Sequence, residues 1–202
     1  MPGLSLSLLG TYEATLNDRP LAKFPTVRAQ ALLIYLATEA AFGAASQRRE
    51  VLVELLWPGM PPNSGRKNLR QTMYYLRQTI GARPAAEEGQ EEIPFLLSDR
   101  YTVEINPEYG LKVDVGQFLG LLSAPKEGWP EAVELYRGDF LTDFYLDDSS
   151  EFEDWLLGRR EYLRRRALET LEALTIQASQ RRAYDEARRY AERQLVIDTL
   201  RE

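Results

Sequence analysis

Short alternations of apolar and polar residues fill the first 24 positions of the chain. Leucines alternate with serines over residues 4–8, and a second alternation spans residues 12–16 before the Asn17-Asp18 pair. Successive side chains of a strand point to opposite faces, so a period of two indicates half-buried strands. We therefore predict two short strands joined by a turn, with a third strand over residues 20–24.

Helical periodicity replaces this alternation from residue 26 onward. The Ala/Leu-rich stretch 26–41 predicts a mostly buried helix that ends at Gly43. Ser46 is expected to cap a second helix that closes at residues 57–59, and a third helix runs from residues 61–64 to Ile80. The inner faces are predicted to carry Val51, Leu52, Leu55 and Leu56 in the second helix, and Leu69, Met73, Leu76 and Ile80 in the third.

A hairpin is predicted after the third helix. The acidic stretch 87–92 indicates a loop. Residues 94–97 and 101–105 then form two strand-like runs around a turn at residues 98–100, with Tyr101, Val103 and Ile105 on one face. Strands, three helices and a hairpin in this order are the arrangement of a winged helix-turn-helix, which we predict for residues 1–108.

Residues 109–202 carry mainly helical patterns. A short amphipathic helix is predicted over residues 129–137, a long helix follows the capping box formed by Ser150 and Glu153, and a last helix spans residues 182–196. Antiparallel helices with alanines at their contacts resemble a tetratricopeptide pair. The expected fold class is thus an α+β N-terminal winged helix-turn-helix followed by an all-α, tetratricopeptide-like domain over 109–202. Because residues 196–202 contain no helix-ending signal, we expect this domain to continue beyond them.

The inner faces of these last two helices are predicted from the same spacing. They carry Phe152, Trp155, Leu156, Leu163, Ala167, Leu171 and Leu174 in the long helix, and Ala183, Ala187, Tyr190, Ala191 and Leu195 in the last one.

Composition excludes several function classes. The chain of 202 residues has no histidine and no cysteine, which removes Ser-His-Asp triads, cysteine nucleophiles, zinc fingers and imidazole metal ligands. It also lacks both common glycine-rich phosphate loops, and the acidic cluster at residues 139–154 matches no EF-hand spacing. We therefore expect no enzyme, with no catalytic residue, cofactor or metal, and a hydrolase built on the acidic cluster is the least favoured class.

No targeting or membrane-spanning segment is recognisable in the sequence. The first five residues lack a positive charge, and the longest apolar stretch, 29–45, is interrupted by Gln30, Thr38 and Glu39. We expect a cytoplasmic protein that does not bind a membrane.

Charge is distributed unevenly along the chain. There are 25 Lys+Arg and 31 Asp+Glu, for a net charge of −6. Residues 1–106 hold 11 basic and 11 acidic side chains, whereas residues 107–202 hold 14 and 20, so the acidic excess lies in the second half. Residues 55–86 nevertheless contain no acidic side chain and five basic ones, which are Arg66, Lys67, Arg70, Arg77 and Arg83. Such a local inversion of charge favours contact with a polyanion.

The third helix is the candidate nucleic-acid contact. Helical residues turn by about 100° each, so Lys67, Gln71, Tyr74 and Gln78 point away from the core, and Arg66, Arg70 and Arg77 line one edge. Lys67, Gln71 and Tyr74 suit base edges in a major groove, and the arginine edge suits phosphates. Arg100, at the hairpin turn, is placed to meet a minor groove or a phosphate. A solvated basic surface without nucleic acid is the alternative interpretation.

A second basic run, residues 159–166, is interleaved with acids on the long helix. We interpret it mainly as pairing within the helix and as solvated surface.

The ordered motifs resemble those of the Streptomyces antibiotic regulatory protein family. In the first half these are LLG at 8–10, RAQALLIYL at 28–36, LLWP at 55–58 and NLRQTMYYLR at 68–77. In the second half, VDV at 113–115, YRGDFL at 136–141, FEDWL at 152–156 and QLVID at 194–198 are similar to that family's bacterial transcriptional activation domain. Many family members have more basic residues where Tyr74 and Tyr75 stand here.

The resemblance implies an OmpR-type winged helix-turn-helix that binds double-stranded promoter DNA, often as tandem copies on direct repeats. It also implies that the activation domain contacts RNA polymerase or a second protomer, and that larger relatives carry a nucleotide-binding module beyond this region. We therefore expect a sequence-specific transcriptional activator that recruits RNA polymerase and can form a homodimer on direct repeats. The alternative is a protein-interaction module whose winged domain no longer binds DNA, which the acidic net charge and the 87–92 loop favour.

Overall fold

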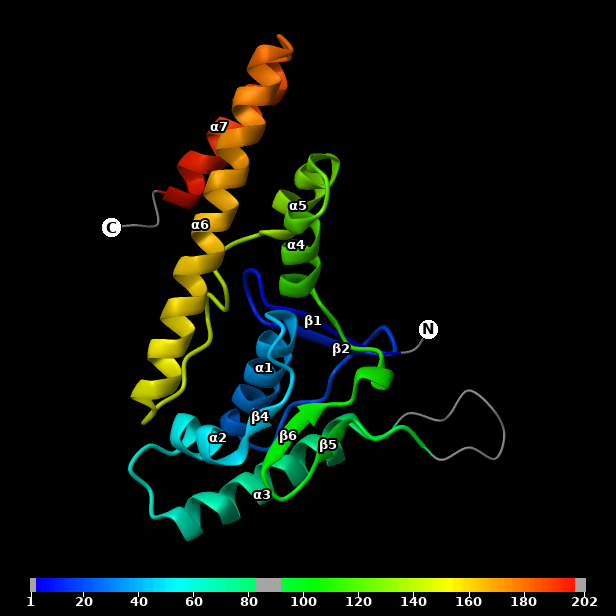
Figure 1. The fold of residues 1–202 in the computed structure, drawn as a ribbon, viewed down its shortest axis with the longest axis vertical. Coiled ribbons are helices and arrows are strands. Elements are labelled where there is room, and N and C mark those ends of the chain that lie inside the picture. Colours follow the sequence, from blue (N-terminus) through cyan, green and yellow to red (C-terminus); the bar gives the residue numbers. More distant parts are fainter. Residues whose placement is uncertain (1–2, 83–91, 199–202) are drawn as a thin grey trace.

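The computed structural model describes residues 3–82 and 92–198, and it places a small β-rich region before and between helices (Figure 1). The strands are β1 (Leu4–Ser7), β2 (Glu13–Leu16), β3 (Arg19–Pro20), β4 (Gln47–Arg48), β5 (Leu96–Ser98), β6 (Thr102–Ile105) and β7 (Lys112–Val113). The α-helices are α1 (Val27–Ala41), α2 (Arg49–Leu56), α3 (Pro62–Ile80), α4 (Asp114–Ser123), α5 (Trp129–Leu135), α6 (Ser150–Gln180) and α7 (Tyr184–Asp198).

The N-terminal sheet has the strand order β3-β2-β1-β7. Strands β1 and β2 pair antiparallel, with Leu4 opposite Leu16, and the turn after β2 uses left-handed conformations at Asn17 (φ 54°) and Asp18 (φ 61°). These features confirm the two alternating strands and their turn. The third strand expected over residues 20–24 is wrong for all but its first residue: β3 is Arg19–Pro20, and the chain leaves the sheet after Pro20 on its way to the start of α1.

Helix α1 lies at the centre of the fold. The Thr26 hydroxyl accepts a hydrogen bond from the Ala29 amide and caps its N-terminus, and the run from Leu32 to Leu36 is almost completely buried. This confirms the buried helix expected over residues 26–41. Burial on all sides follows from its neighbours: α1 contacts α2, α3, α4 and strands of both sheets.

The start of α2 differs from the expectation. Ser46 is not the cap, because Gln47 and Arg48 form strand β4 opposite Val103 and Thr102 of β6, and the helix begins only at Arg49. The expected inner face is wrong at one position, since Val51 is exposed while Val53 is buried. The two-residue pairing of β4 with β6, at the edge of the three-stranded sheet β4-β6-β5, thus fixes where α2 starts.

Helix α3 and the hairpin after it follow the expectation closely. The inner face of α3 is buried as predicted, and the helix ends at Gly81, which has a φ of 77°. Strands β5 and β6 form the hairpin, with Val103 and Ile105 buried. Tyr101 does not join that face, because it lies in the turn before β6 and is 67% exposed.

The second half is helical, with differences in detail. Helix α4 is not among the helices predicted from the sequence. The cap of α6 is Ser149, not Ser150, and Glu153 accepts a hydrogen bond from the Leu146 amide instead of closing a capping box. Leu195 of α7 is exposed, since the face that packs on α6 passes through Gln194 and Ile197.

Residues on both sides of the expected boundary at 108 form one structure. Strand β7 pairs in parallel with β1. The Asp114 carboxylate, at the start of α4, accepts hydrogen bonds from the Leu8 amide (2.8 Å) and the Leu9 amide (2.9 Å). Burial raises the pKa of Asp114, and these amides together with Arg137 oppose that rise. The turn at Phe140 also bridges to Leu9 and Gly10, so two elements of the second half complete the N-terminal region.

Three arginines of α6 connect distant segments, which corrects the interpretation of the basic run. Arg159 forms a bidentate ion pair with Glu39 of α1, with contacts of 2.6 and 2.8 Å. Arg160 donates to the carbonyl oxygens of Phe140 and Leu141, and Arg164 donates to that of Ile197. Only Arg165 and Arg166 pair within the helix as expected, both with Glu169. These three side chains bind residues outside α6 and not acids within it, because they lie on the packed side of the helix.

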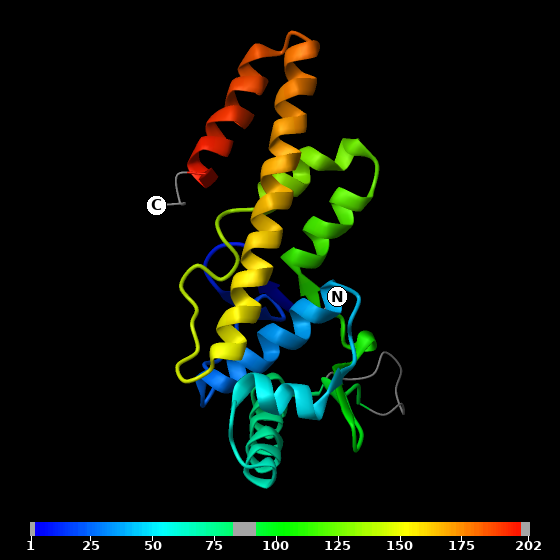
Figure 2. The same cartoon turned by 60° about the vertical axis from the view of Figure 1, so that its left-hand side comes forward.

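Helix α6 runs along the long axis, and its first half lies over α1 and α2 (Figure 2). Trp155 packs against Tyr35 with ring centroids 5.0 Å apart, and its indole nitrogen donates to Glu39. Among the described residues, no helix is both long and apolar enough to cross a membrane.

Replacing Glu39 by Gln tests the contact between α6 and α1. Glu39 is 7% exposed, and the substitution leaves the partly exposed Arg159 guanidinium without its counter-charge, so we expect a loss of about 2 kcal/mol in the free energy of unfolding, as for other hydrogen bonds to charged groups. Urea denaturation followed by circular dichroism measures it. Glu54→Gln, an exposed position on α2, is the matched control, and equal stability of the two variants would contradict the assignment.

Candidate nucleic-acid interface

Helix α3 lies at one end of the molecule, beside the β5–β6 hairpin (Figure 1). Its first turn starts at Pro62, which needs no amide partner at that position. Gly65 allows the close approach to α2, because a β-carbon there would collide with Val53. The buried row from Leu69 to Ile80 then fixes the rotation of the helix about its own axis.

That rotation exposes the residues proposed from sequence. Arg66, Lys67, Arg70, Gln71, Tyr74 and Arg77 are all exposed. We call Lys67, Gln71, Tyr74 and Gln78 the crest of α3, and Arg66, Arg70 and Arg77 its basic flank. The 19 residues of the helix include no carboxylate, so nothing on α3 neutralises these cations.

Arg77 is more constrained than the other arginines. Its guanidinium donates to the Ser98 hydroxyl of β5 at 3.0 Å. Partial burial lowers the pKa of Arg77, and the nearby charge of Arg49 lowers it further. Arg77 therefore joins the basic flank to the hairpin, and a part of its hydrogen-bonding capacity is already used.

The basic flank opens into a groove between α2, α3 and the hairpin turn. This groove, about 780 Å³ in volume, is lined by Arg48, Arg49, Arg66, Arg70 and Arg100, and we call it the arginine groove. Glu50 and Glu54 also line it, and Glu50 is paired with Arg48 at 3.0 Å. Arginines thus outnumber carboxylates in the groove.

Sequence reasoning missed Arg48 and Arg49. They precede the acid-free window of residues 55–86 and are followed directly by Glu50, so charge counting passes over them. The Nε atom of Arg49 is buried and has no hydrogen-bond partner among the described residues. No local sequence signal marks them: the pairing of residues 47–48 with β6, which the structure reveals, places both side chains next to α3.

Arg100 lies at the hairpin turn, as expected. It is exposed, and its guanidinium carbon is 5.6 Å from the centre of the Tyr101 ring. The turn is held by Asp99, whose carboxylate accepts from the amides of Tyr101 (2.7 Å) and Thr102 (2.6 Å). The structure thus brings Arg100 to the same groove as Arg66 and Arg70.

Two parts of the sequence interpretation lie partly or wholly outside the described residues. Arg83 lies wholly outside them. Of the acidic stretch 87–92 the structure describes only Glu92, which is exposed. Over 3–82 and 92–198, no group of three or more acidic side chains is placed to hold a metal ion.

Chemically, the arrangement suits an extended polyanion. Arginines present planar forks that match phosphate oxygens. Lys67 and Gln71 offer donors, and Gln71 also an acceptor, to groups that approach the crest. The crest and the basic flank are exposed from one end of the helix to the other, so a rod-shaped ligand can contact both together.

Comparisons with known proteins concern the fold. No family model and no curated protein sequence matches this chain. Among solved structures, it is similar to Mycobacterium tuberculosis EmbR in complex with a low-affinity phosphopeptide, with a TM-score of 0.58 and 19% sequence identity. The similarity covers 86% of this chain and 46% of that chain, so this chain spans about half the length of EmbR. The β-rich region and the helices after it are therefore arranged as in part of EmbR.

The hairpin turn is expected to depend on pH through Asp99. Its hydrogen bonds with Thr102 and Tyr101 lower the pKa of Asp99 from 3.8. Because the pKa of Asp99 is lower in the folded protein, the stability that its ionised carboxylate contributes is present above pH 3.8. That stability is lost as the pH falls through the folded-state pKa. Carboxyl carbon NMR should show a titration midpoint below 3.8, accompanied by shifts of the Tyr101 and Thr102 amides. A midpoint at or above 3.8 would contradict the role of Asp99, and Asp99→Asn should abolish the titration step.

Proposed function

We propose that this protein is a sequence-specific DNA-binding transcriptional regulator of the Streptomyces antibiotic regulatory protein type. In this proposal residues 1–108 act as a winged helix-turn-helix, α3 is the recognition helix and the β5–β6 hairpin is the wing. The single observation that carries it is the exposed, carboxylate-free surface of α3, joined to the arginine groove. The similarity of fold to EmbR and the motifs of both halves support it.

The contacts divide into two kinds. The crest of α3 would enter the major groove, where Gln71 can pair with the donor and acceptor of adenine and Lys67 with guanine acceptors. The arginine groove would hold the phosphate backbone, which positions the helix without reading sequence. Tyr74 is 52% exposed. Its ring and hydroxyl would contact the bases directly, whereas a basic residue at this position would add only charge.

The helical half is proposed to act as an activation domain. Its tetratricopeptide-like pair α6–α7 would contact RNA polymerase or a second protomer on a direct repeat, and the regulator would act in the cytoplasm. Because α6 is fixed to α1 through Glu39, a partner bound to α6 would be held at a set distance from the DNA. We propose no catalytic activity and no cofactor.

A protein-interaction module is the second candidate. The acidic excess of residues 107–202 and the exposed Tyr184, Leu195 and Val196 of α7 favour it. In that case the fold would present α7 to a protein partner, and α3 would not bind DNA above a non-specific level.

Salt dependence of DNA binding tests the proposal. If four to six phosphates are neutralised, the logarithm of the association constant should fall with log[salt] at a slope of roughly −4 to −5. Fluorescence polarisation against the upstream region of the protein's own gene measures both affinity and slope. The variant in which Lys67, Arg70 and Arg77 are all alanine should bind at least tenfold more weakly and with a shallower slope.

A matched control separates the surface of α3 from net charge. Replacing Arg165, Arg181 and Arg188 by alanine removes the same charge from exposed positions on the helical half, and this variant should keep nearly full affinity. Equal affinity of the two triple variants, both folded by circular dichroism, would defeat the assignment of α3. Absence of binding by the wild type to any upstream fragment would favour the protein-interaction module.

Base preference is expected to depend on Gln71. Removing its amide by Gln71→Ala should relax discrimination at one position of the site by about 1–3 kcal/mol, because a bidentate base contact is lost. Gln78→Ala, about two turns further along the crest, is the control for general loss of polarity. Selection of bound sequences from a random DNA pool measures the preference, and identical selected sequences for wild type and Gln71→Ala would exclude this role.

A further inference from the structure

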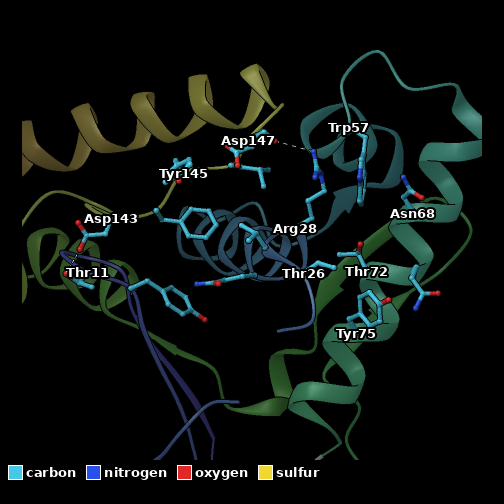
Figure 3. A pocket seen from close by; sticks show the side chains of 16 residues that line it. Thr11, Thr26, Arg28, Trp57, Asn68, Thr72, Tyr75, Asp143, Tyr145 and Asp147 are labelled. Atoms are coloured by element: carbon cyan, nitrogen blue, oxygen red, sulfur yellow. Dashed lines mark hydrogen bonds between the residues drawn. The ribbon is translucent and has the colours of Figure 1, made fainter. Parts of the chain in front are cut away.

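A second concavity lies on the flank of α3 opposite the arginine groove. It is a cleft of about 830 Å³ between the start of α1, α3 and the segment that joins α5 to α6. Trp57, Asn68, Thr72 and Tyr75 lie on one side of it, and Thr11 and Asp143 lie on the other (Figure 3). Pockets for small ligands commonly measure 300–1,000 Å³ and form where two parts of a fold meet. Both properties apply here.

Aromatic side chains make up much of the wall. They are contributed by four different segments of the chain and comprise Tyr12, Trp57, Tyr75, Phe144 and Tyr145. Phe144 is held from behind by Phe152 of α6, with ring centroids 5.8 Å apart. Trp57 is 8% exposed, so its ring is fixed by the core. Rigid flat walls of this kind favour a flat aromatic ligand.

The charged groups of the cleft argue against an anion. The Arg28 guanidinium already donates to the carbonyl oxygens of Leu56 (3.0 Å) and Asp147 (3.2 Å), as Figure 3 shows for the latter. The Asp143 carboxylate accepts from the Thr11 hydroxyl, and the side chain of Asp147 is exposed at the rim. Two carboxylates therefore face one cation whose donors are partly used, and the excess charge is negative.

One buried polar atom of the wall lacks a partner. The Tyr12 hydroxyl is buried and has no hydrogen-bond partner among the described residues. Burial raises the pKa of Tyr12 to about 12, so the group is a neutral donor at physiological pH. A buried hydroxyl without a partner is costly, and a ligand with an acceptor oxygen would remove that cost.

We propose that this cleft binds a flat aromatic molecule, uncharged or cationic, that carries carbonyl or hydroxyl oxygens. The rings of Trp57, Tyr75 and Phe144 pack on its faces, and the Tyr12 hydroxyl donates to one of its oxygens after a small movement of the ring. The ligand would touch Gln71 and Tyr75, which also belong to α3. Binding to the cleft does not require the proposed DNA-binding function, so the two can fail separately.

Nile red, an uncharged flat dye with a carbonyl group, is the probe. Titration of the whole chain, followed by the rise in dye fluorescence, should saturate at one dye per protein. Val27→Trp places a large side chain in the cleft from an exposed position of α1, and we expect the dissociation constant to rise at least tenfold. Val51→Trp, at an exposed position of α2 that does not line the cleft, should stay within twofold of the wild type.

Two further variants address the wall itself and guard against misfolding of the first. Phe144→Ala removes one ring and should weaken binding several-fold. Tyr12→Phe keeps the ring and removes only the hydroxyl, so binding should weaken several-fold while the melting temperature is unchanged or higher. A purely structural role of Tyr12 would not produce that combination.

The charge of the rim is tested with an anionic dye. Anilinonaphthalene sulfonate should bind the wild type weakly, and Asp147→Lys should strengthen its binding at least fivefold while it leaves the affinity for Nile red within twofold. The proposal is overturned if Nile red does not saturate at one site, or if Val27→Trp, Phe144→Ala and Tyr12→Phe, each folded by circular dichroism, all bind it as the wild type does.

Discussion

The carboxylate of Glu39 determines how the two halves of this protein sit together. It lies near the end of the central helix α1 and accepts three hydrogen bonds from Arg159 and one from the Trp155 indole, both side chains of α6. A buried carboxylate needs such partners, because an isolated charge is too costly to remove from water. Arg159 also lies 4.0 Å above the Phe42 ring. The long helix is thereby held against the helix on which α2 and α3 pack.

A second set of contacts continues the junction on the other side of α1. Strand β7 pairs with β1, and the Asp114 carboxylate and the turn at Phe140 bind residues 8–10, which directly follow β1. Arg160 in turn holds that turn from α6. The N-terminal sheet therefore depends on residues more than 100 positions later in the chain.

The orientation of α3 follows from this framework, and its two flanks differ in chemistry. One flank faces the arginine groove and suits phosphate groups, whereas the other faces an aromatic cleft with an acidic rim. The crest between them stays exposed. Under the two proposals, α3 would contact DNA and a small molecule on different sides, and Gln71 belongs both to the crest and to the lining of the cleft. The joining segment between α5 and α6 forms the far wall of the cleft, so the helical half contributes directly to the environment of α3.

Local patterns in the sequence determined most of the elements and the exposed residues of α3, because helical and strand periodicity report which side of an element is buried. The same patterns failed at the starts of two helices. The start of α2 is set by the pairing of β4 with the distant strand β6, and the cap of α6 is Ser149 and not Ser150. The arginines of α6 are the clearest case. Their spacing with nearby acids suggested pairing within the helix, but only the tertiary structure places Glu39 and the carbonyl oxygens of Phe140 and Leu141 beside them. Likewise, Arg48 and Arg49 and the aromatic cleft come from segments far apart in the chain, and no local spacing encodes a surface assembled by packing.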